Sequence, residues 1–261
     1  MSVEDELLCE VRDGVAYVTF NRPQARNAMT FAMYDGLASI AEKADADRSI
    51  KAMLLTGAGE KAFAAGTDIS QFRSFSTEED VIGYESRIER VLAALEECRV
   101  PTIAAIAGAC TGGGAAIAAC CDMRIAEKGA RFGFPVARTL GNCLSMGNFA
   151  RLVALIGPAH TKDLLFTARL VEAPEAKALG LIGEVVEGYA TLRTRAKELV
   201  RTVVGNAPLT LQAAKEAVRR LRPRLAEGDG RDLLFMCYLS EDFREGMDAF
   251  LTKRKPDWKG R

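Results

Sequence analysis

Two short segments rich in small residues carry the clearest chemical signal in this sequence. The first is Phe63–Ile69, with the sequence FAAGTDI, and the second is Gly108–Gly114, with the sequence GACTGGG. Each follows an apolar run typical of a strand and precedes an expected helix, so its backbone N–H groups can point outward. Two N–H groups aimed at one point stabilise an oxygen that gains negative charge. Each turn alone also fits an ordinary loop or a closely packed helix start, but together they predict an oxyanion site.

The local sequence of each turn indicates which backbone groups can face outward. Gly66 permits a backbone conformation that a β-carbon would forbid, and Asp68 can cap the short helical turn that follows it. The N–H of Thr67 is then left free. In the second turn, Gly113 opens an expected helix over Gly113–Cys120, whose dipole adds partial positive charge at that end. The first turn therefore offers the Thr67 N–H, and the second turn offers the N–H groups at the start of that helix.

The hydrophobic pattern predicts the elements that position these turns. Strands alternate with helices in the first half of the chain and helices dominate the second half, which describes an α/β core with a helical C-terminal part. The expected strands are Leu7–Arg12, Val15–Phe20, Lys51–Thr56, Pro101–Ala107, Met123–Ala126, Arg131–Phe134 and Val185–Val186. The expected helices are one capped by Thr30, a short turn at Ile69–Phe72, Glu78–Cys98, Gly113–Cys120, Ser145–Ile156, Pro158–Phe166, Pro174–Leu179, Tyr189–Val204, Pro208–Leu221, Arg231–Leu239 and Glu241–Leu251.

Composition and charge limit the classes of function. The chain has 261 residues, with 35 Lys and Arg against 35 Asp and Glu, so its net charge is zero. A balanced charge argues against bulk nucleic-acid binding, which draws most of its affinity from phosphate neutralisation. No apolar stretch is long enough to span a membrane, and the acidic start Met1–Glu6 does not resemble a signal peptide. We expect a cytoplasmic protein that binds neither nucleic acid nor membrane.

The seven cysteines and the single histidine fit that expectation. No two cysteines form a CxxC pair, and none of the spacings suits a metal site. Because the number of cysteines is odd, reduced and buried thiols are the simplest interpretation. His160 lies at an expected helix start far from the two turns, where a cap or surface role suits it. We therefore expect no metal ion.

The two turns and their flanking sequences together resemble the enoyl-CoA hydratase/isomerase family, or crotonase superfamily. Several segments match the motifs of that family in order, across essentially the whole chain. They are Asn21–Pro23 with Asn27–Met29, Phe63–Ile69, Pro101–Gly108, Gly112–Gly114, Cys121–Ala126, Gly180–Val186, and the C-terminal segments Ser240–Asp242, Glu245–Met247, Phe250–Leu251 and Lys253–Pro256. Any one of these motifs is weak, but their shared order makes the resemblance specific.

The resemblance implies a crotonase-like spiral of ββα units, with C-terminal helices that assemble trimers or paired trimers. On that basis residues 1–205 are expected to form the α/β core with the acyl-CoA site. Residues 206–261 are expected to form a helical region for oligomerisation and CoA capping, and the change falls near Gly205–Pro208. A homotrimer or homohexamer is therefore the expected assembly.

The resemblance also implies an acyl-CoA thioester as substrate and no cofactor beyond the coenzyme A that the substrate carries. It places the thioester oxygen between the N–H groups of Thr67 and Gly113, in agreement with the pattern of the turns. It further implies CoA contacts with the backbone near Arg22, Arg26 and Ala28, and with Ala64, Asp68 and Ile69. Phe250 and Lys253 match positions that reach the CoA of a neighbouring subunit, where cations suit phosphates, although Lys253–Lys255 also fits a solvated tail.

Two glutamates that act in the hydratases of this family are absent. One lies three residues after the middle glycine of the triplet, where this chain has Ala116. The other lies four residues after the first phenylalanine of the segment Arg131–Pro135, where this chain has Val136. Hydration needs a base that activates water and an acid that protonates the α-carbon, and neither side chain can move a proton. We therefore do not expect the two-glutamate mechanism, nor an isomerase that uses the second glutamate alone.

The expected helix Glu78–Cys98 offers two replacements. Glu89 stands where some relatives place an active-site residue, and Glu85 lies one turn earlier on the same face. Either residue could serve as the general base. Both also fit a charged face turned to solvent, because arginines flank them.

The segment after Val136 offers three more candidates. Arg138 could bind a substrate carboxylate or form a surface ion pair. Asn142 could orient water or a substrate carbonyl. Cys143 could act as a nucleophile or acid, since a helix start lowers a thiol pKa, or be a packed thiol.

We expect an enzyme of acyl-CoA and fatty-acid metabolism, a lyase or isomerase that stabilises a thioester enolate. The first choice is addition or removal of a group at the enoyl double bond by unusual residues. Isomerisation or decarboxylation comes second, and for decarboxylation Arg138 could help to hold the leaving carboxylate. The rival from another class is a catalytically idle acyl-CoA-binding subunit of an oligomer.

Overall fold

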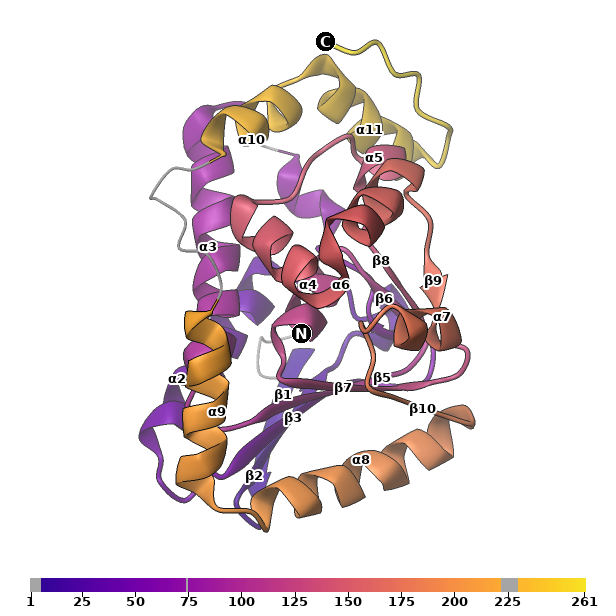
Figure 1. The fold of residues 1–261 in the computed structure, drawn as a ribbon. Helices are drawn as coiled ribbons and strands as arrows, with labels where there is room; N and C mark the ends of the chain where they lie inside the picture. The colour runs from indigo at the N-terminus through magenta and orange to yellow at the C-terminus, as the bar shows by residue number, and fades with distance from the viewer. Residues whose placement is uncertain (1–5, 74, 222–229) are drawn as a thin grey trace.

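The computed structural model describes residues 6–73, 75–221 and 230–261 of the chain. The first five residues of the acidic N-terminus therefore lie outside the described residues. Two β-sheets form the centre of the fold, and helices surround them (Figure 1). The protein thus has the mixed α/β architecture that the sequence predicts.

The larger sheet has six strands in the order β1-β2-β3-β5-β7-β10. Its first two strands form an antiparallel hairpin through Asp13 and Gly14, which both have positive φ, as tight hairpin turns require. The other strands run parallel, and β3 and β5 are almost wholly buried because both faces of the sheet are covered. The strands are β1 (Leu7–Arg12), β2 (Val15–Phe20), β3 (Ala52–Gly57), β5 (Thr102–Ile106), β7 (Met123–Glu127) and β10 (Glu184–Val186).

The smaller sheet has the strand order β4-β6-β8-β9. β4 (Ala62–Ala64), β6 (Ala109–Thr111) and β8 (Arg131–Gly133) run parallel, and β9 (Val171–Glu172) pairs antiparallel with β8. Each of the three parallel strands directly follows a strand of the larger sheet, so the chain passes from the larger sheet to the smaller one three times. The sequence pattern predicts only β8 of these, because strands of two or three residues are too short to show alternation.

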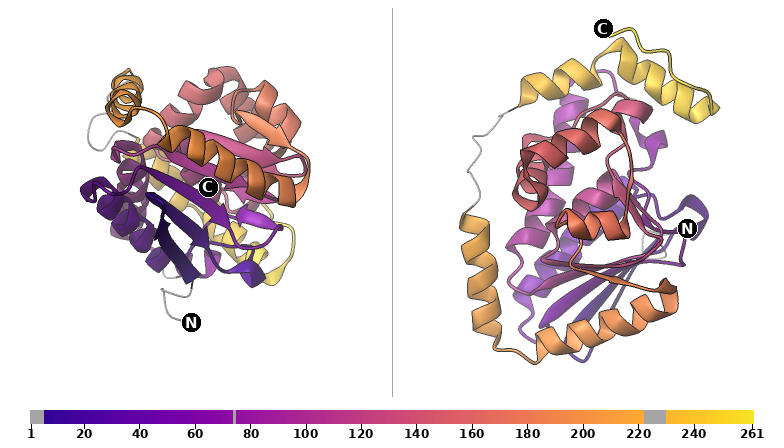
Figure 2. Two further views of the ribbon diagram at one scale, coloured as in Figure 1. Left: turned by 90° about the horizontal axis from the view of Figure 1, so that it is seen from below. Right: turned by 45° about the vertical axis from the view of Figure 1, so that its right-hand side comes forward.

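Helices cover both faces of the larger sheet. α8 (Gly188–Val204) lies across one face and packs its apolar side on β3, β5 and β7, as the left view of Figure 2 shows. The other face carries the main core, which includes α2 (Phe31–Ala46), α3 (Glu78–Glu97) and α4 (Gly113–Cys120). The remaining helical segments are η1 (Pro23–Ala25), η2 (Ile69–Phe72), α5 (Val136–Thr139), α6 (Met146–Thr167), α7 (Ala173–Ala178), α9 (Pro208–Arg220), α10 (Arg231–Tyr238) and α11 (Glu241–Thr252).

Local sequence signals set several helix starts. The Thr30 side chain caps α2 by accepting from the Met33 N–H, and the Asp68 carboxylate caps η2 by accepting from the Ser70 N–H. Both caps are predicted from the sequence. Gly157 has non-helical angles inside α6 (φ 73°, ψ 166°), so α6 consists of the two successive helices predicted there, joined across a kink.

The C-terminal helices pack back onto the core. α8 ends at Val204 with Gly205 as its cap, at the predicted change to the C-terminal region. α10 and α11 lie at the end of the molecule opposite α8 (Figures 1 and 2). Phe243 of α11 is buried and its ring lies 6.2 Å from that of Phe72 in η2, next to the first turn. In the described parts of the chain we find no helix with the length and apolar character that a membrane crossing requires.

Candidate active site

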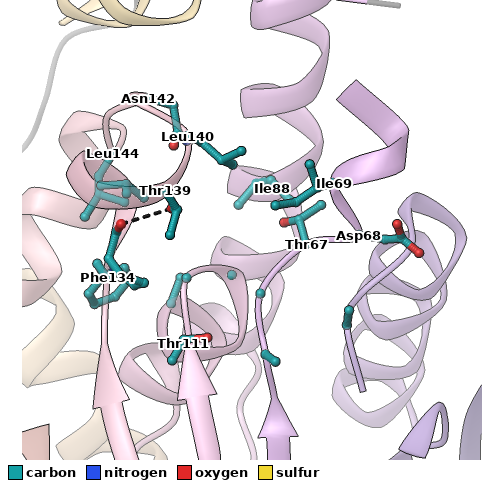
Figure 3. Close-up of a pocket in the computed structure, with 18 of the residues that line it drawn as sticks. Thr67, Asp68, Ile69, Ile88, Thr111, Phe134, Thr139, Leu140, Asn142 and Leu144 are labelled. Carbon is teal, nitrogen blue, oxygen red and sulfur yellow. Dashed lines mark hydrogen bonds between the residues drawn. The ribbon is translucent and has the colours of Figure 1, made fainter. Parts of the chain in front are cut away.

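A cavity of about 500 Å³ lies at the carboxyl ends of β4, β6 and β8 (Figure 3). The loops that follow these strands all reach it, because parallel strands end at the same edge of a sheet. Side chains on its two sides in Figure 3 are Thr67, Ile69 and Ile88, facing Phe134, Thr139 and Leu144. A cavity of this size suits a small molecule or the reacting part of a larger one.

The first turn brings the Thr67 N–H to this cavity. Gly66 has a φ of +100°, which side chains rarely allow, and its carbonyl accepts from the Met29 N–H at 2.8 Å. The Asp68 N–H donates to the Met29 carbonyl, also at 2.8 Å. These two bonds fix the backbone on either side of Thr67. Within the described residues, the Thr67 N–H itself donates to no protein acceptor, so it is open to a ligand.

The second turn lies alongside the first. Gly112 has a φ of +52°, and a β-carbon on it would lie 3.5 Å from Cα of Gly66. Gly113 is the first residue of α4, where an N–H group has no acceptor inside the helix. A β-carbon on Gly113 would lie 3.1 Å from Oγ1 of Thr67 and would overlap the hydroxyl of Tyr34. The two expected donors are therefore neighbours at the cavity.

Two buried tyrosines hold the Thr67 side chain. Its Oγ1 lies 2.9 Å from the Tyr34 hydroxyl and 3.1 Å from the Tyr84 hydroxyl. Burial raises the pKa of both tyrosines, so their hydroxyls stay protonated and share hydrogen bonds with Thr67. Tyr34 comes from α2 and Tyr84 from α3. Two core helices thus fix the first turn.

The two positions that lack a glutamate also line the cavity. Ala116 of α4 is buried, and Val136 is the first residue of α5. Both contribute apolar surface next to the turns. Acid–base chemistry in this cavity therefore needs a group from another element.

Glu85 of α3 is placed to supply that group. It lines the cavity, and burial raises its pKa from 4.5 to about 7. The Tyr238 hydroxyl donates to Oε1 of Glu85 at 2.9 Å and opposes this rise, while the charge of Glu89 adds to it. A carboxyl with a pKa of about 7 is present in both protonation states near neutral pH, as an acid–base catalyst requires.

The structure places neither Glu89 nor Arg138 at the cavity, which corrects the prediction for both. Glu89 forms an ion pair with Arg151 of α6, whose side chain is 5% exposed and also binds Glu96 at 2.9 Å. Glu89 lies one turn further along α3 than Glu85, and its carboxylate is held by α6 instead of lining the cavity. Arg138 lies on the short helix α5 and is exposed.

The structure favours a packed thiol at Cys143. The side chain lines the cavity, and its Sγ donates to the Leu233 carbonyl of α10 at 3.4 Å. A hydrogen bond with Cys237 and burial both raise the pKa of Cys143, so it is a poor nucleophile near neutral pH. Asn142 lines the cavity as well, and its Nδ2 donates to the Tyr238 hydroxyl at 3.0 Å.

Some of the residues expected to contact CoA line the cavity, and the others do not. Those that line the cavity are Arg26, Ala28, Asp68, Ile69 and Phe250. Ala64 is fully buried in β4, and Lys253 is exposed at the end of α11, so neither reaches the cavity of this chain. The Arg22 side chain pairs with Glu6 and with Asp68, each at 3.1 Å, so it holds its own segment against the first turn. The burial of Ala64 corrects the contact expected there, whereas the backbone contact expected near Arg22 stays a prediction.

Three tyrosines at the site are not predicted by the sequence pattern. Tyr34, Tyr84 and Tyr238 lie on the apolar faces of their helices and look like ordinary core residues. The one local signal is the hydroxyl itself, since a buried tyrosine usually finds a hydrogen-bond partner. That signal does not name the partner, because each hydroxyl contacts a residue of another element, at least 17 residues away in the sequence.

The fold and the cavity define an α/β protein with two sheets, in which two glycine-containing turns and the Glu85 carboxyl border one cavity. A family model described as enoyl-CoA hydratase/isomerase matches residues 10–261. The chain belongs to this family of enzymes, and the resemblance seen in the sequence is confirmed.

Relatives of known name support this assignment. A short-chain-enoyl-CoA hydratase of Clostridium acetobutylicum is 36% identical over 96% of this chain and 96% of its own. A solved enoyl-CoA hydratase/carnithine racemase of Magnetospirillum magneticum has a TM-score of 0.80 and 32% identity, covering 98% of this chain and 96% of that chain. A methylmalonyl-CoA decarboxylase structure has a TM-score of 0.87 and 26% identity, covering 98% of this chain and 99% of that chain. The crotonase-like fold is thus confirmed as well.

Proposed function

We propose that the protein catalyses the addition of water to the double bond of an enoyl-CoA thioester, or the reverse elimination. The N–H groups of Thr67 and Gly113 hold the thioester oxygen, and Glu85 moves the proton. The observation that carries this proposal is Glu85, a cavity-lining carboxyl with a pKa of about 7. A carboxyl perturbed in this way, in a cavity beside two free N–H groups, is typical of a functional site. It argues against a catalytically idle binding subunit.

One carboxyl is sufficient for both proton transfers. The Glu85 carboxylate accepts a proton from water as the water oxygen bonds to Cβ of the enoyl group. The electron pair of the double bond moves into a thioester enolate, whose oxygen the two N–H groups stabilise. The carboxylic acid of Glu85 then gives its proton to Cα. Elimination follows the same steps in reverse, so Glu85 ends each cycle in its starting state.

Isomerisation of the double bond is the second candidate, and the same carboxyl favours it. Glu85 would remove a proton on one side of the enolate and return it on the other, without water. Decarboxylation has less support, although a decarboxylase is among the similar structures. Arg138 is exposed, and an ionised Glu85 would repel the carboxylate of such a substrate.

We also propose a homotrimer or homohexamer, in which residues 206–261 serve oligomerisation and CoA capping beside a core of residues 1–205. Exposed apolar side chains on the C-terminal helices support this, among them Leu209, Leu221 and Met236. Phe250 and Lys253 of α11 are both exposed, which leaves them accessible to the CoA of a neighbouring subunit in such an assembly. Light scattering of the purified protein measures the assembly, and a monomer at working concentration would contradict it.

We further propose that the protein works in the cytoplasm and needs no cofactor beyond the CoA of its substrate. Each proton transfer described above uses only Glu85 and water. All seven cysteines are free thiols in the structure, which fits a reducing compartment.

Crotonyl-CoA and a panel of substituted acyl-CoA thioesters, followed by mass spectrometry, test the reaction. Hydration adds the mass of water, isomerisation changes only chromatographic retention, and decarboxylation loses carbon dioxide. Glu85→Gln is expected to lower turnover by about 10²–10⁴-fold while ligand binding is kept. Glu89→Gln is the matched control on the same helix, and should keep most of its turnover. Full turnover in Glu85→Gln, or tight binding without product across the panel, contradicts the proposal.

A further inference from the structure

Tyr238 reaches the cavity from a distant part of the chain. It lies at the end of α10, is 3% exposed, and packs its ring 5.0 Å from that of Phe243 and 6.2 Å from that of Tyr84. Its hydroxyl touches two cavity-lining residues, Glu85 on α3 and Asn142 in the loop before α6. The C-terminal helix α10 thus contributes a buried polar group to this cavity.

The hydrogen bonds of Tyr238 have a fixed direction. The Asn142 Nδ2 is an amide nitrogen that can only donate, and it donates to the Tyr238 oxygen at 3.0 Å. The single hydroxyl proton of Tyr238 then goes to Oε1 of Glu85 at 2.9 Å. A donor aimed at a carboxyl oxygen favours the ionised form of the carboxyl and also limits its rotation.

The other groups that act on Glu85 are Tyr34 on α2, Tyr84 and Glu89 on α3, and Cys143 in the loop before α6. Burial raises the pKa of the two phenols, and a hydrogen bond with Cys237 together with burial raises that of the thiol. These three groups are therefore uncharged near neutral pH. The charge of Glu89 and the burial of Glu85 both favour the protonated carboxyl. Among the described groups that act on Glu85, Tyr238 is the one that favours ionisation.

We propose that Tyr238 is a positioning residue, which holds the Glu85 carboxyl toward the cavity and keeps it available as a base, and that Asn142 orients the Tyr238 hydroxyl for this role. The proposal deepens the proposed function and rests on it, because it assigns the residues that control the acid–base group. It also gives α10 a part in the chemistry, beyond closing the fold.

The first test is the pH dependence of turnover in Tyr238→Phe. The phenylalanine keeps the ring packing and removes the donor, so the proton affinity of Glu85 should rise about tenfold, as expected for one hydrogen bond to a charged group. The acid limb of the pH–rate profile should move to higher pH by the corresponding amount. Tyr189→Phe, on α8 at the far end of the molecule, is the matched control and should leave the profile in place. A folded Tyr238→Phe variant with an unmoved limb overturns the proposal.

The second test does not depend on turnover. Carbon-13 NMR of protein labelled at glutamate carboxyls, assigned with Glu85→Gln, measures the titration of Glu85 in the protein without ligand. A higher pKa in Tyr238→Phe supports the positioning role even where no substrate of the panel reacts, so failure of the proposed function is distinguished from failure of this inference. An unchanged pKa overturns the inference even where turnover is high.

A third variant keeps the proposal testable if Tyr238→Phe does not fold, as judged by circular dichroism. Asn142→Ala removes the donor that orients the Tyr238 hydroxyl and leaves α10 intact. It should raise the pKa of Glu85 in the same direction, by less than tenfold in proton affinity. An Asn142→Ala protein that titrates like the native one counts against the proposal.

Discussion

The Tyr34 hydroxyl lies between the two turns that carry the N–H donors. It bonds Oγ1 of Thr67 at 2.9 Å, and it occupies the space that a β-carbon of Gly113 would need. Gly113 is therefore required for a reason beyond backbone freedom. Its missing side chain lets a tyrosine from α2 hold the neighbouring turn.

At this residue scale we expect Gly113→Ala to lower kcat/KM by about 10²–10³-fold, the effect of losing one oxyanion donor. The added methyl group pushes the Tyr34 hydroxyl away from Thr67 and disturbs both turns at once. The double variant Gly113→Ala with Tyr34→Phe removes the overlapping oxygen and should recover part of the loss, measured against Tyr34→Phe alone. Circular dichroism checks that all three fold. If the alanine variant matched the native enzyme, the assigned geometry of the second turn would be wrong.

The position of α4 on β4 sets the spacing between the two turns. A β-carbon on Gly114 would overlap the carbonyl and Cβ of Ala64, so the helix start lies directly against the strand that precedes the first turn. Gly83 on α3 is the opposite case, because nothing lies within 4 Å of the β-carbon it would carry. Two glycines in helices thus have different reasons to be there.

At the element scale we expect Gly114→Ala to lower the free energy of unfolding by about 1–3 kcal/mol, as overpacking does in a tight core. Gly83→Ala should raise it by about 0.5–1 kcal/mol, because alanine is the better helix former. Urea unfolding of the two variants and the native protein measures both changes. Equal effects at the two positions would mean that α4 does not pack on β4 as described.

The elements that the sequence predicts well are those with a long pattern or a clear end signal. α4 has its predicted bounds because a glycine triplet marks its start, and α3 is predicted to within one residue because its apolar spacing covers five turns. β4 and β6 are missed because three residues cannot show a period. Glu85 is found as a candidate beside Glu89, and the choice between them depends on the ion pair with Arg151, which no local pattern reveals. Tyr238 is missed because its partner Glu85 lies 153 residues away.

At the scale of the whole molecule, the cavity joins segments from both ends of the chain. The turn at Thr67 comes from the first third, and Tyr238 and Phe250 come from the last two helices. Phe243 of α11 packs on Phe72 beside the first turn, so the C-terminal helices and the core share one hydrophobic cluster. A carboxyl enclosed by this arrangement is removed from water, so its ionisation lowers the free energy of unfolding of the whole protein.

The raised pKa of buried Glu85 predicts how the stability of the protein depends on pH. The pKa of Glu85 is about 7 in the folded protein against an ordinary value of 4.5 in the unfolded chain, so between these values the folded state holds a proton that the unfolded state releases. Stability therefore falls as pH rises from below 4.5 to above 7, by up to about 3 kcal/mol from this one group.

Glu85→Gln keeps the shape of the protonated carboxyl and cannot ionise. We expect it to lie within about 1 kcal/mol of the native protein in urea unfolding at pH 5 and to be more stable by about 3 kcal/mol at pH 8, while it loses turnover. Glu89→Gln, which weakens the pairing of buried Arg151, should be less stable than native at both pH values. An equal gain for Glu85→Gln at pH 5 and pH 8 would show that Glu85 ionises normally in the fold, and the assignment of Glu85 as the acid–base group would lose its physical basis.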